Sequence, residues 1–149
     1  MIDWENILTN VYHKEDGVRS ATSKKFKIDL INFFDFEKFN KYNVVELGSY
    51  CGDTTYILCK LFNKVDAFEI DASRIEKSKH KLGSRNTNVN FHQMDIYDTS
   101  IVWPIKDYEV AFIDCIHKTD HVLHDIKNVK RNSNKLKYII FDDYGAHPD

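Results

Sequence analysis

Short apolar runs alternate with amphipathic stretches along most of this chain. Five runs read as buried strands, because they are rich in β-branched and aromatic residues and are bounded by polar turns. They cover residues 42–47, 65–70, 89–94, 108–113 and 138–141. Between them, apolar positions recur at helical spacing in residues 53–62, 71–83 and 117–130. Strands that alternate with helices predict a parallel sheet with right-handed crossovers.

The N-terminal forty residues predict helices and no strand. Residues 4–11 and 23–34 each place apolar side chains on one face, with a polar loop at 14–23. At 149 residues the chain is long enough for one core and too short for two. We therefore expect a single domain, with a helical cap at 1–40 and the core at 41–149.

Helical spacing also places several polar side chains. In residues 117–130 it predicts four inward positions, Val122, Leu123, Ile126 and Val129. His121 and His124 then fall on the polar side of this helix and are expected at the surface. Lys24, Lys25 and Lys27 read as a charged helix face, because the aromatic residues nearby are not interleaved with basic ones as on a nucleic-acid platform.

The most informative stretch is Asn43–Thr55, which reads N-V-V-E-L-G-S-Y-C-G-D-T-T. A buried strand ends in a turn containing Gly48 and Gly52, and residues typical of an N-cap then open a helix. This order is typical of nucleotide-binding α/β folds. Tyr50 stands where a dinucleotide fingerprint has its middle glycine, which argues against a pyrophosphate ligand and hence against an NAD-dependent enzyme.

Residues 46–52, E-L-G-S-Y-C-G, resemble the first motif of class I S-adenosylmethionine-dependent methyltransferases, in the form seen in catechol O-methyltransferase. The resemblance covers residues 43–148 and implies a Rossmann-like, doubly wound parallel sheet of about five strands in the order 3-2-1-4-5. It implies S-adenosylmethionine as cofactor, with contacts from Glu46, Gly48, Ser49, Tyr50, Gly52, Thr54, Glu69, Ile70, Asp95, Ile96 and Asp114.

The ends of the second and third strands carry two of these contacts. Glu69 stands where a carboxylate accepts both ribose hydroxyls, and Asp71 is better placed to cap the next helix. The alternative is that both acids are helix-start residues favoured by the helix dipole. In the resemblance, Asp95 binds the adenine amine and Ile96 packs on the ring, although acidic turns after strands are common.

Three carboxylates follow the fourth and fifth strands, namely Asp114, Asp142 and Asp143. Carboxyl ends of parallel strands meet at one sheet edge, and hard oxygen ligands in this number suit Mg²⁺. The resemblance to metal-dependent O-methyltransferases implies such a site. His117 matches the catalytic lysine of catechol O-methyltransferase and a histidine of the sugar and macrolide enzymes, so it is the expected base beside Asp114. The alternative is a solvated cap and ordinary strand-end acids.

Composition limits the partners. The chain is 42% hydrophobic and 30% charged with a net charge of −2, which gives no reason to expect a nucleic acid or an anionic membrane. No apolar run approaches the roughly 18–20 residues of a membrane span, and the start lacks the pattern of a signal peptide. Cys51, Cys59 and Cys115 lack metal-ligand spacing and are expected to be reduced thiols of a cytoplasmic protein.

The resemblance implies Mg²⁺-assisted O-methylation of a small hydroxylated acceptor. The alternative is a protein that binds S-adenosylmethionine without transferring its methyl group, because the family continues with two strands that this sequence lacks. The chain is then either minimal or a fragment. Its fifth strand is left as an edge that the N-terminal helices or a second copy in a homodimer would cover.

Overall fold

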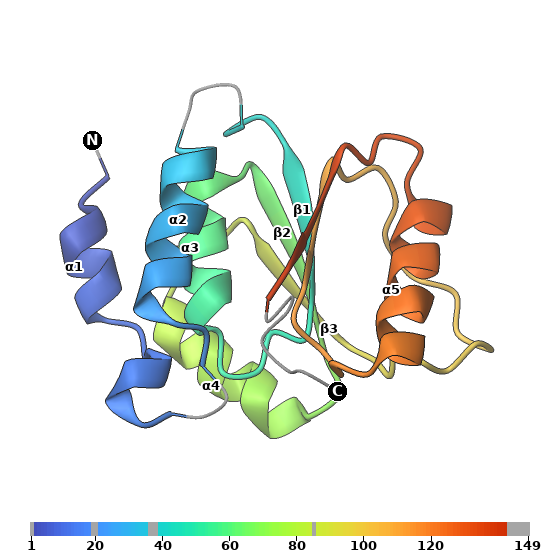
Figure 1. The fold of residues 1–149 in the computed structure, drawn as a ribbon, viewed down its shortest axis with the longest axis horizontal. Helices are drawn as coiled ribbons and strands as arrows, with labels where there is room; N and C mark the ends of the chain where they lie inside the picture. The colour runs from blue at the N-terminus through green and yellow to red at the C-terminus, as the bar shows by residue number, and fades with distance from the viewer. Residues whose placement is uncertain (1, 19–20, 36–38, 85, 143–149) are drawn as a thin grey trace.

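The sheet contains five strands in the order β3-β2-β1-β4-β5, and every neighbouring pair is parallel. Their bounds are β1 (Asn43–Leu47), β2 (Lys64–Glu69), β3 (Val89–Gln93), β4 (Val110–Ile113) and β5 (Tyr138–Phe141). The computed structural model describes residues 2–18, 21–35, 39–84 and 86–142 (Figure 1). It confirms the predicted Rossmann-like fold and strand order.

Helices cover both faces of this sheet. They are α1 (Trp4–Thr9), α2 (Lys24–Phe34), α3 (Asp53–Leu61), α4 (Ala72–Leu82) and α5 (Thr119–Asn132). The first four lie on one side of the sheet and α5 lies on the other (Figure 1). The loop expected over residues 14–23 contains one 3-10 turn, η1 (Lys14–Asp16). Ser23 caps α2 by accepting a hydrogen bond from the N–H of Phe26, as its sequence position predicted.

Alternate residues of the strands point into two separate apolar cores. Val44 of β1 packs with the core under α1, α2 and α3, whereas Val45 packs with the core under α5. The first core is rich in phenylalanine, with Phe34, Phe39 and Phe62 in edge or tilted contacts. Because both faces are covered, successive residues of the central strands β1, β2 and β4 are buried rather than alternating between buried and exposed.

The inner face of α5 is more polar than its spacing predicted. Leu123 is 49% exposed, so the prediction that it points inward is wrong, whereas Asp125 is fully buried. Asp125 lies on the same helical stripe as Val129, whereas Leu123, two residues before Asp125, points to the opposite side of the helix. The hydroxyl of Tyr97 donates to Asp125 Oδ2 at 3.2 Å.

His121 and His124 are less exposed than their place on the polar side of the helix predicted. Both are half-buried, and the ring of Tyr97 packs against each of them. The two histidines are partly buried for the same reason as Asp125, because Tyr97 from the segment after β3 reaches this side of α5.

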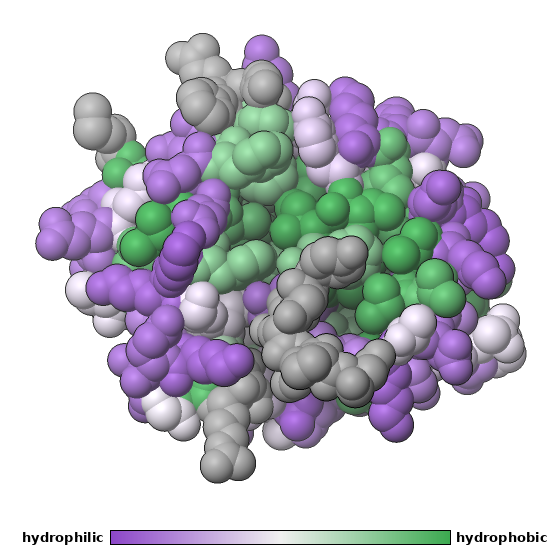
Figure 2. Space-filling view, in the orientation of Figure 1, coloured by the Kyte–Doolittle hydropathy of each residue, from purple (hydrophilic) through white to green (hydrophobic). Residues whose placement is uncertain are grey.

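β3 and β5 form the two edges of the sheet. All four residues of β5 are half-buried, and Figure 2 shows apolar surface in the middle of the face between the helices on the left and α5 on the right. The homodimer through this edge stays a prediction. Within the described ranges, no helix combines the length and the apolar character needed to cross a bilayer.

Candidate functional site

The loop between β1 and α3 is fitted closely to its neighbours. Gly48 has φ +86°, and a Cβ at this position would lie 2.2 Å from the carbonyl oxygen of Asp114. The N–H groups of Gly48 and Ser49 both donate to the carbonyl of Phe68, at 3.1 and 3.0 Å. Only glycine allows the loop to pass this close to the end of β4.

Tyr50 takes a glycine-like backbone within the same loop. Its φ of +47° lies in the left-handed region, which is rare for a bulky residue. Three contacts hold it there. Its N–H donates to Glu69 Oε2 at 2.9 Å, its carbonyl accepts from Ser78 Oγ at 3.2 Å, and its ring lies 4.6 Å from the Arg74 guanidinium. Tyr50 therefore has a left-handed backbone at the position where a dinucleotide fingerprint has its middle glycine.

Arg74 and Ser78 were not identified from the sequence. They lie one turn apart on α4, so both reach the same face of the helix. The i, i+4 spacing is the only signal that the sequence offered, and it does not say that this face meets Tyr50.

Glu69 ends β2 as predicted and is buried. Its Oε1 accepts from the N–H of Asp71 at 3.0 Å and lies 3.5 Å from Arg74 Nη1. Ile70 beside it is exposed. Asp71 caps α4 by accepting from the N–H of Ser73, the role expected for it. Glu69 therefore ties the loop at Tyr50 to β2, and a carboxylate still has lone pairs for a ligand.

Glu46 lies under the loop rather than on the wall of a cavity. It is fully buried, and its Oε2 accepts from Thr55 Oγ1 at 2.6 Å. Burial raises the pKa of Glu46 to about 8. Its Oε1 has no hydrogen-bond partner among the described residues. The geometry places this acid in support of the loop, and direct contact with a ligand stays a prediction.

A small cavity of about 20 Å³ opens at this loop. Its walls include Ala21, Thr22, Gly48, Ser49, Tyr50, Thr54 and Asp114. Five of the residues predicted to contact a cofactor, Gly48, Ser49, Tyr50, Thr54 and Asp114, thus line one space. Gly52 lies beside it with φ +79° at the start of α3, close to Ser78.

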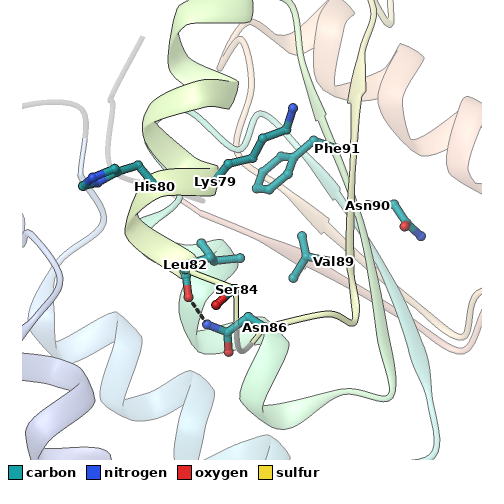
Figure 3. Close-up of a pocket in the computed structure, with 9 residues that line it drawn as sticks. Lys79, His80, Leu82, Ser84, Asn86, Val89, Asn90 and Phe91 are labelled. Carbon is teal, nitrogen blue, oxygen red and sulfur yellow. Dashed lines mark hydrogen bonds between the residues drawn. The ribbon is translucent and has the colours of Figure 1, made fainter.

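A larger hollow of about 580 Å³ lies elsewhere, between the end of α4 and β3 (Figure 3). Lys79, Leu82, Asn86, Val89 and Phe91 are among its walls, whereas the ring of His80 points away from the other labelled side chains. Among the described residues that line it there is no carboxylate and none of the predicted site residues. The small cavity at the carboxyl edge is the candidate site, because chemistry-bearing side chains gather there.

Asp114 and Asp142 follow neighbouring strands at the same edge. The N–H of Asp114 donates to Leu47 and that of Asp142 donates to Ile113, at 2.9 and 3.2 Å. The Nε2 atom of His117 lies 3.7 Å from Asp114 Oδ1, and the His117 side chain is 41% exposed. The structure thus brings the predicted base beside the predicted acid.

The predicted metal site is incomplete in the described part of the chain. Asp143 lies outside the described residues, and among those described no three His, Cys, Asp or Glu side chains group as metal ligands. Asp114 and Asp142 alone do not make up the set of three carboxylates that the sequence predicted.

Asp95 and Ile96 follow β3 as expected. Asp95 is exposed, and its Oδ1 accepts from the N–H of Tyr97 at 2.9 Å, which shapes the turn. Ile96 is buried in the core under α5. Neither residue lines the small cavity, so their role at an adenine ring stays a prediction.

Two features of the N-terminal region were not predicted. Thr22 lines the cavity, although no motif marks it in the sequence. Lys27 is fully buried, so placing it on a charged helix face was wrong. Its ammonium group donates to the carbonyls of Tyr12 and Thr22, which satisfy it inside the protein.

Comparisons with known proteins agree with this fold. A model of a methyltransferase-domain family matches residues 45–144. The solved structure of a tRNA methyltransferase from Aquifex aeolicus matches with a TM-score of 0.66 and 17% identity. The match covers 92% of this chain and 52% of the tRNA methyltransferase. The structure of a dimethyladenosine transferase from Plasmodium falciparum matches with a TM-score of 0.62 and 21% identity. This match covers 82% of this chain and 42% of the dimethyladenosine transferase.

A third solved structure shows a ligand. Phosphoethanolamine N-methyltransferase 1 from Haemonchus contortus, in complex with phosphoethanolamine and S-adenosylhomocysteine, has a TM-score of 0.58 and 18% identity, covering 70% of this chain and 22% of its own. The chain therefore spans about half or less of the length of these three proteins. A search of curated proteins found no match.

The family match covers two thirds of the chain and contains the whole sheet apart from the first residues of β1. The solved structures, all below 25% identity, agree on the fold. The chain belongs to the class I S-adenosylmethionine-dependent methyltransferases.

Proposed function

We propose that this protein binds S-adenosylmethionine at the carboxyl edge of β1 and β2 and transfers the methyl group to a hydroxyl oxygen of a small acceptor. The observation that carries the proposal is the meeting of the glycine-bearing loop with Asp114 at one cavity, with His117 3.7 Å from that carboxylate. Bare backbone suits close approach of a nucleoside ligand. A carboxylate–imidazole pair suits removal of a proton from an acceptor.

His117 is the base of the proposed reaction. A neutral imidazole can accept a proton from an acceptor hydroxyl as a general base. Asp114 stabilises the imidazolium that forms, because its carboxylate faces Nε2. The acceptor oxygen bonds to the methyl carbon while the carbon–sulfur bond breaks. The electron pair of the broken bond stays on sulfur. The products are a methyl ether, S-adenosylhomocysteine and a proton on His117.

Mg²⁺ assistance is part of the proposal. Asp114, Asp142 and Asp143 would hold the ion, which would lower the pKa of the acceptor hydroxyl. Since only two of these carboxylates are described, the proton transfer above is assigned to His117 and Asp114 alone. Activity measured after treatment with a chelator and again after Mg²⁺ is restored tests this part. Turnover that the chelator leaves unchanged would remove the metal from the proposal.

Calorimetric titration tests the cofactor first. We expect S-adenosylhomocysteine to bind and NAD not to bind, because the loop carries Tyr50 in place of a glycine. Glu69→Gln replaces one carboxylate oxygen, which accepts from a backbone N–H, by an amide NH2 group that cannot accept. The substitution should weaken S-adenosylhomocysteine binding about tenfold or more. Absence of S-adenosylhomocysteine binding in the wild type would exclude the proposed function.

Turnover on a panel of small hydroxylated acceptors tests the chemistry. His117→Ala should lower kcat about 100-fold or more without lowering Tm, since the side chain is exposed. Asp120→Asn, an exposed acid in the first turn of α5, is the matched control and should leave kcat unchanged. Binding of S-adenosylhomocysteine without turnover on any acceptor would favour the alternative of a binding protein.

A further inference from the structure

A buried acid on α5 takes no part in the proposed reaction. Asp125 is fully buried, and burial raises its pKa above the ordinary value. Its Oδ2 accepts from the Tyr97 hydroxyl at 3.2 Å, whereas its Oδ1 lies 3.6 Å from His124 Nδ1, which is too far for a good hydrogen bond. Burying an acid with one oxygen poorly satisfied opposes folding, so stability alone does not account for Asp125.

Tyr97 connects this helix to the turn after β3. Its N–H donates to Asp95 Oδ1 at 2.9 Å, so its backbone belongs to the turn predicted to meet adenine. Its ring packs against His121 and His124, with ring centroids 4.9 and 5.3 Å away, and its hydroxyl reaches Asp125. These three partners all lie in the first two turns of α5. One side chain thus fixes the beginning of α5 relative to the end of β3.

The beginning of α5 determines where the proposed base lies. His117 is two residues before Thr119, the first residue of the helix. The carbonyl of Lys118 accepts from the N–H groups of His121 and Val122, at 2.9 and 3.0 Å. The residue next to His117 is therefore part of the hydrogen bonding that starts α5, and a shift of this end of the helix would move His117.

The residue on the other side of His117 also meets Tyr97. Burial raises the pKa of the Tyr97 hydroxyl, and the nearby backbone N–H of Ile116 opposes this rise. Tyr97 therefore contacts the loop directly at Ile116 and acts on it through α5 at Lys118, and His117 lies between these two points. The 3.7 Å separation of His117 Nε2 from Asp114 Oδ1 depends on where this loop is held.

We infer that Tyr97, whose hydroxyl Asp125 orients, is a positioning residue that holds His117 beside Asp114 for the proposed methyl transfer. The inference rests on the proposed function, because that function makes His117 the base. Alignment of reacting groups supplies much of the rate of such a reaction, and a misplacement of about 1 Å can cost about 100-fold. In this role Tyr97 acts on the rate only through His117, not by contact with the acceptor.

Tyr97→Phe removes the hydroxyl and keeps the ring. We expect kcat on the best of the small hydroxylated acceptors to fall about tenfold or more. Calorimetry should show S-adenosylhomocysteine binding close to the wild-type affinity, because the ring and the backbone turn remain. This split between kcat and affinity is not expected if the hydroxyl serves only the fold.

Tyr108→Phe is the matched control. The Tyr108 side chain is buried, and its hydroxyl donates to the Val129 carbonyl of α5 at 2.8 Å. The control thus removes a buried hydrogen bond to the same helix, but toward the end that is far from His117. It should lower Tm and leave kcat unchanged when both variants are measured below their Tm.

Two substitutions of Asp125 separate the hydrogen bond from the charge. Asp125→Asn keeps an oxygen that can accept from the Tyr97 hydroxyl, so kcat should stay close to the wild-type value. Asp125→Leu removes the acceptor and should lower kcat as far as Tyr97→Phe does. The double variant Tyr97→Phe/Asp125→Leu should be no slower than either single variant, because both changes remove the same hydrogen bond.

Hydrogen exchange measures the positioning without an acceptor. The amides of His121 and Val122, which bond to Lys118, should exchange roughly three- to tenfold faster in Tyr97→Phe than in the wild type. The rates are compared with those of amides in β1, which report global unfolding. In Tyr108→Phe the ratio of the two sets of rates should stay at its wild-type value.

Failure of the inference can be distinguished from failure of the proposed function. If the wild type methylates an acceptor and Tyr97→Phe retains the kcat of Tyr108→Phe, the inference is wrong and the proposed function stands. Equal exchange ratios in these two variants would also overturn the inference. If the wild type methylates no acceptor, the proposed function fails and the inference fails with it. Tyr97→Phe decides the matter even if Asp125→Leu does not fold.

Discussion

The loop between β1 and α3 and the loop between β4 and α5 meet at one sheet edge but are built differently. The first is held by its backbone, with Ser49 and Thr54 buried and with positive φ at Gly48 and Tyr50. The second turns side chains toward solvent, since Ile116 is 43% exposed and His117 is comparably open. The comparison teaches that one loop supplies a fixed shape for a ligand, whereas the other supplies chemistry where an acceptor arrives.

The strongest challenge to this comparison is Gly48→Ala. Its Cβ would lie 2.2 Å from the Asp114 carbonyl, so the two loops would have to separate. We expect a loss of about 4 kcal/mol or more in the free energy of unfolding, measured with urea. Gly17→Ala is the control, because Gly17 also has a positive φ but no atom lies within 4 Å of the added Cβ. It should cost only about 1–2 kcal/mol. Equal losses would mean that the close approach of the two loops is unimportant.

A second test concerns the acid under the first loop. The pKa of Glu46 is raised from its ordinary value of 4.5 to about 8, so the folded protein keeps a proton that the unfolded chain releases. The stability from this proton is fully present below about pH 4.5 and is lost as pH rises through about 8. Within this window each pH unit removes up to about 1.4 kcal/mol, hence about 2 kcal/mol between pH 6 and pH 7.5.

Glu46→Gln cannot ionise and should lack this slope. Urea unfolding of both proteins at several pH values would measure the difference. If the two stability curves ran parallel from pH 5 to pH 8.5, Glu46 would not hold the proton and the first loop would rest on an ionised acid.

The smallest expected effect belongs to the second loop. Ile116→Ser replaces an exposed apolar side chain, so the free energy of unfolding should change by less than about 0.5 kcal/mol. Chemical denaturation would measure it. A loss above 1 kcal/mol would show that the second loop is packed as tightly as the first, and the comparison would no longer hold.

The parallel sheet was predictable because buried strands and amphipathic helices differ in period and alternate along the chain, whereas the strand order came only from the family resemblance. The positions of Gly48 and Gly52 located the loop for the same local reason. The positive φ of Tyr50 was not predictable, since Glu69, Ser78 and Arg74 impose it and are brought there only by the folded chain.

Buried polar residues were the main source of error. Lys27 looks like a surface residue in any local window, and the carbonyls that accept from it belong to Tyr12 and Thr22. Asp125 on α5 is buried because Tyr97 reaches it from a different part of the chain. Helical spacing identifies which residues share a face, but not which polar groups elsewhere will satisfy that face.

The central position of β1 has a consequence during synthesis. One of its neighbours is β4, and Asn43 and Glu109, which bond where the two strands begin, are 66 residues apart. At about 5 to 20 residues per second, the ribosome needs about 3 to 13 s to make the intervening chain. Throughout that time β1 has an open edge that can pair with another chain. Slower translation between residues 48 and 109 would lengthen this exposure and increase the yield of aggregated nascent protein.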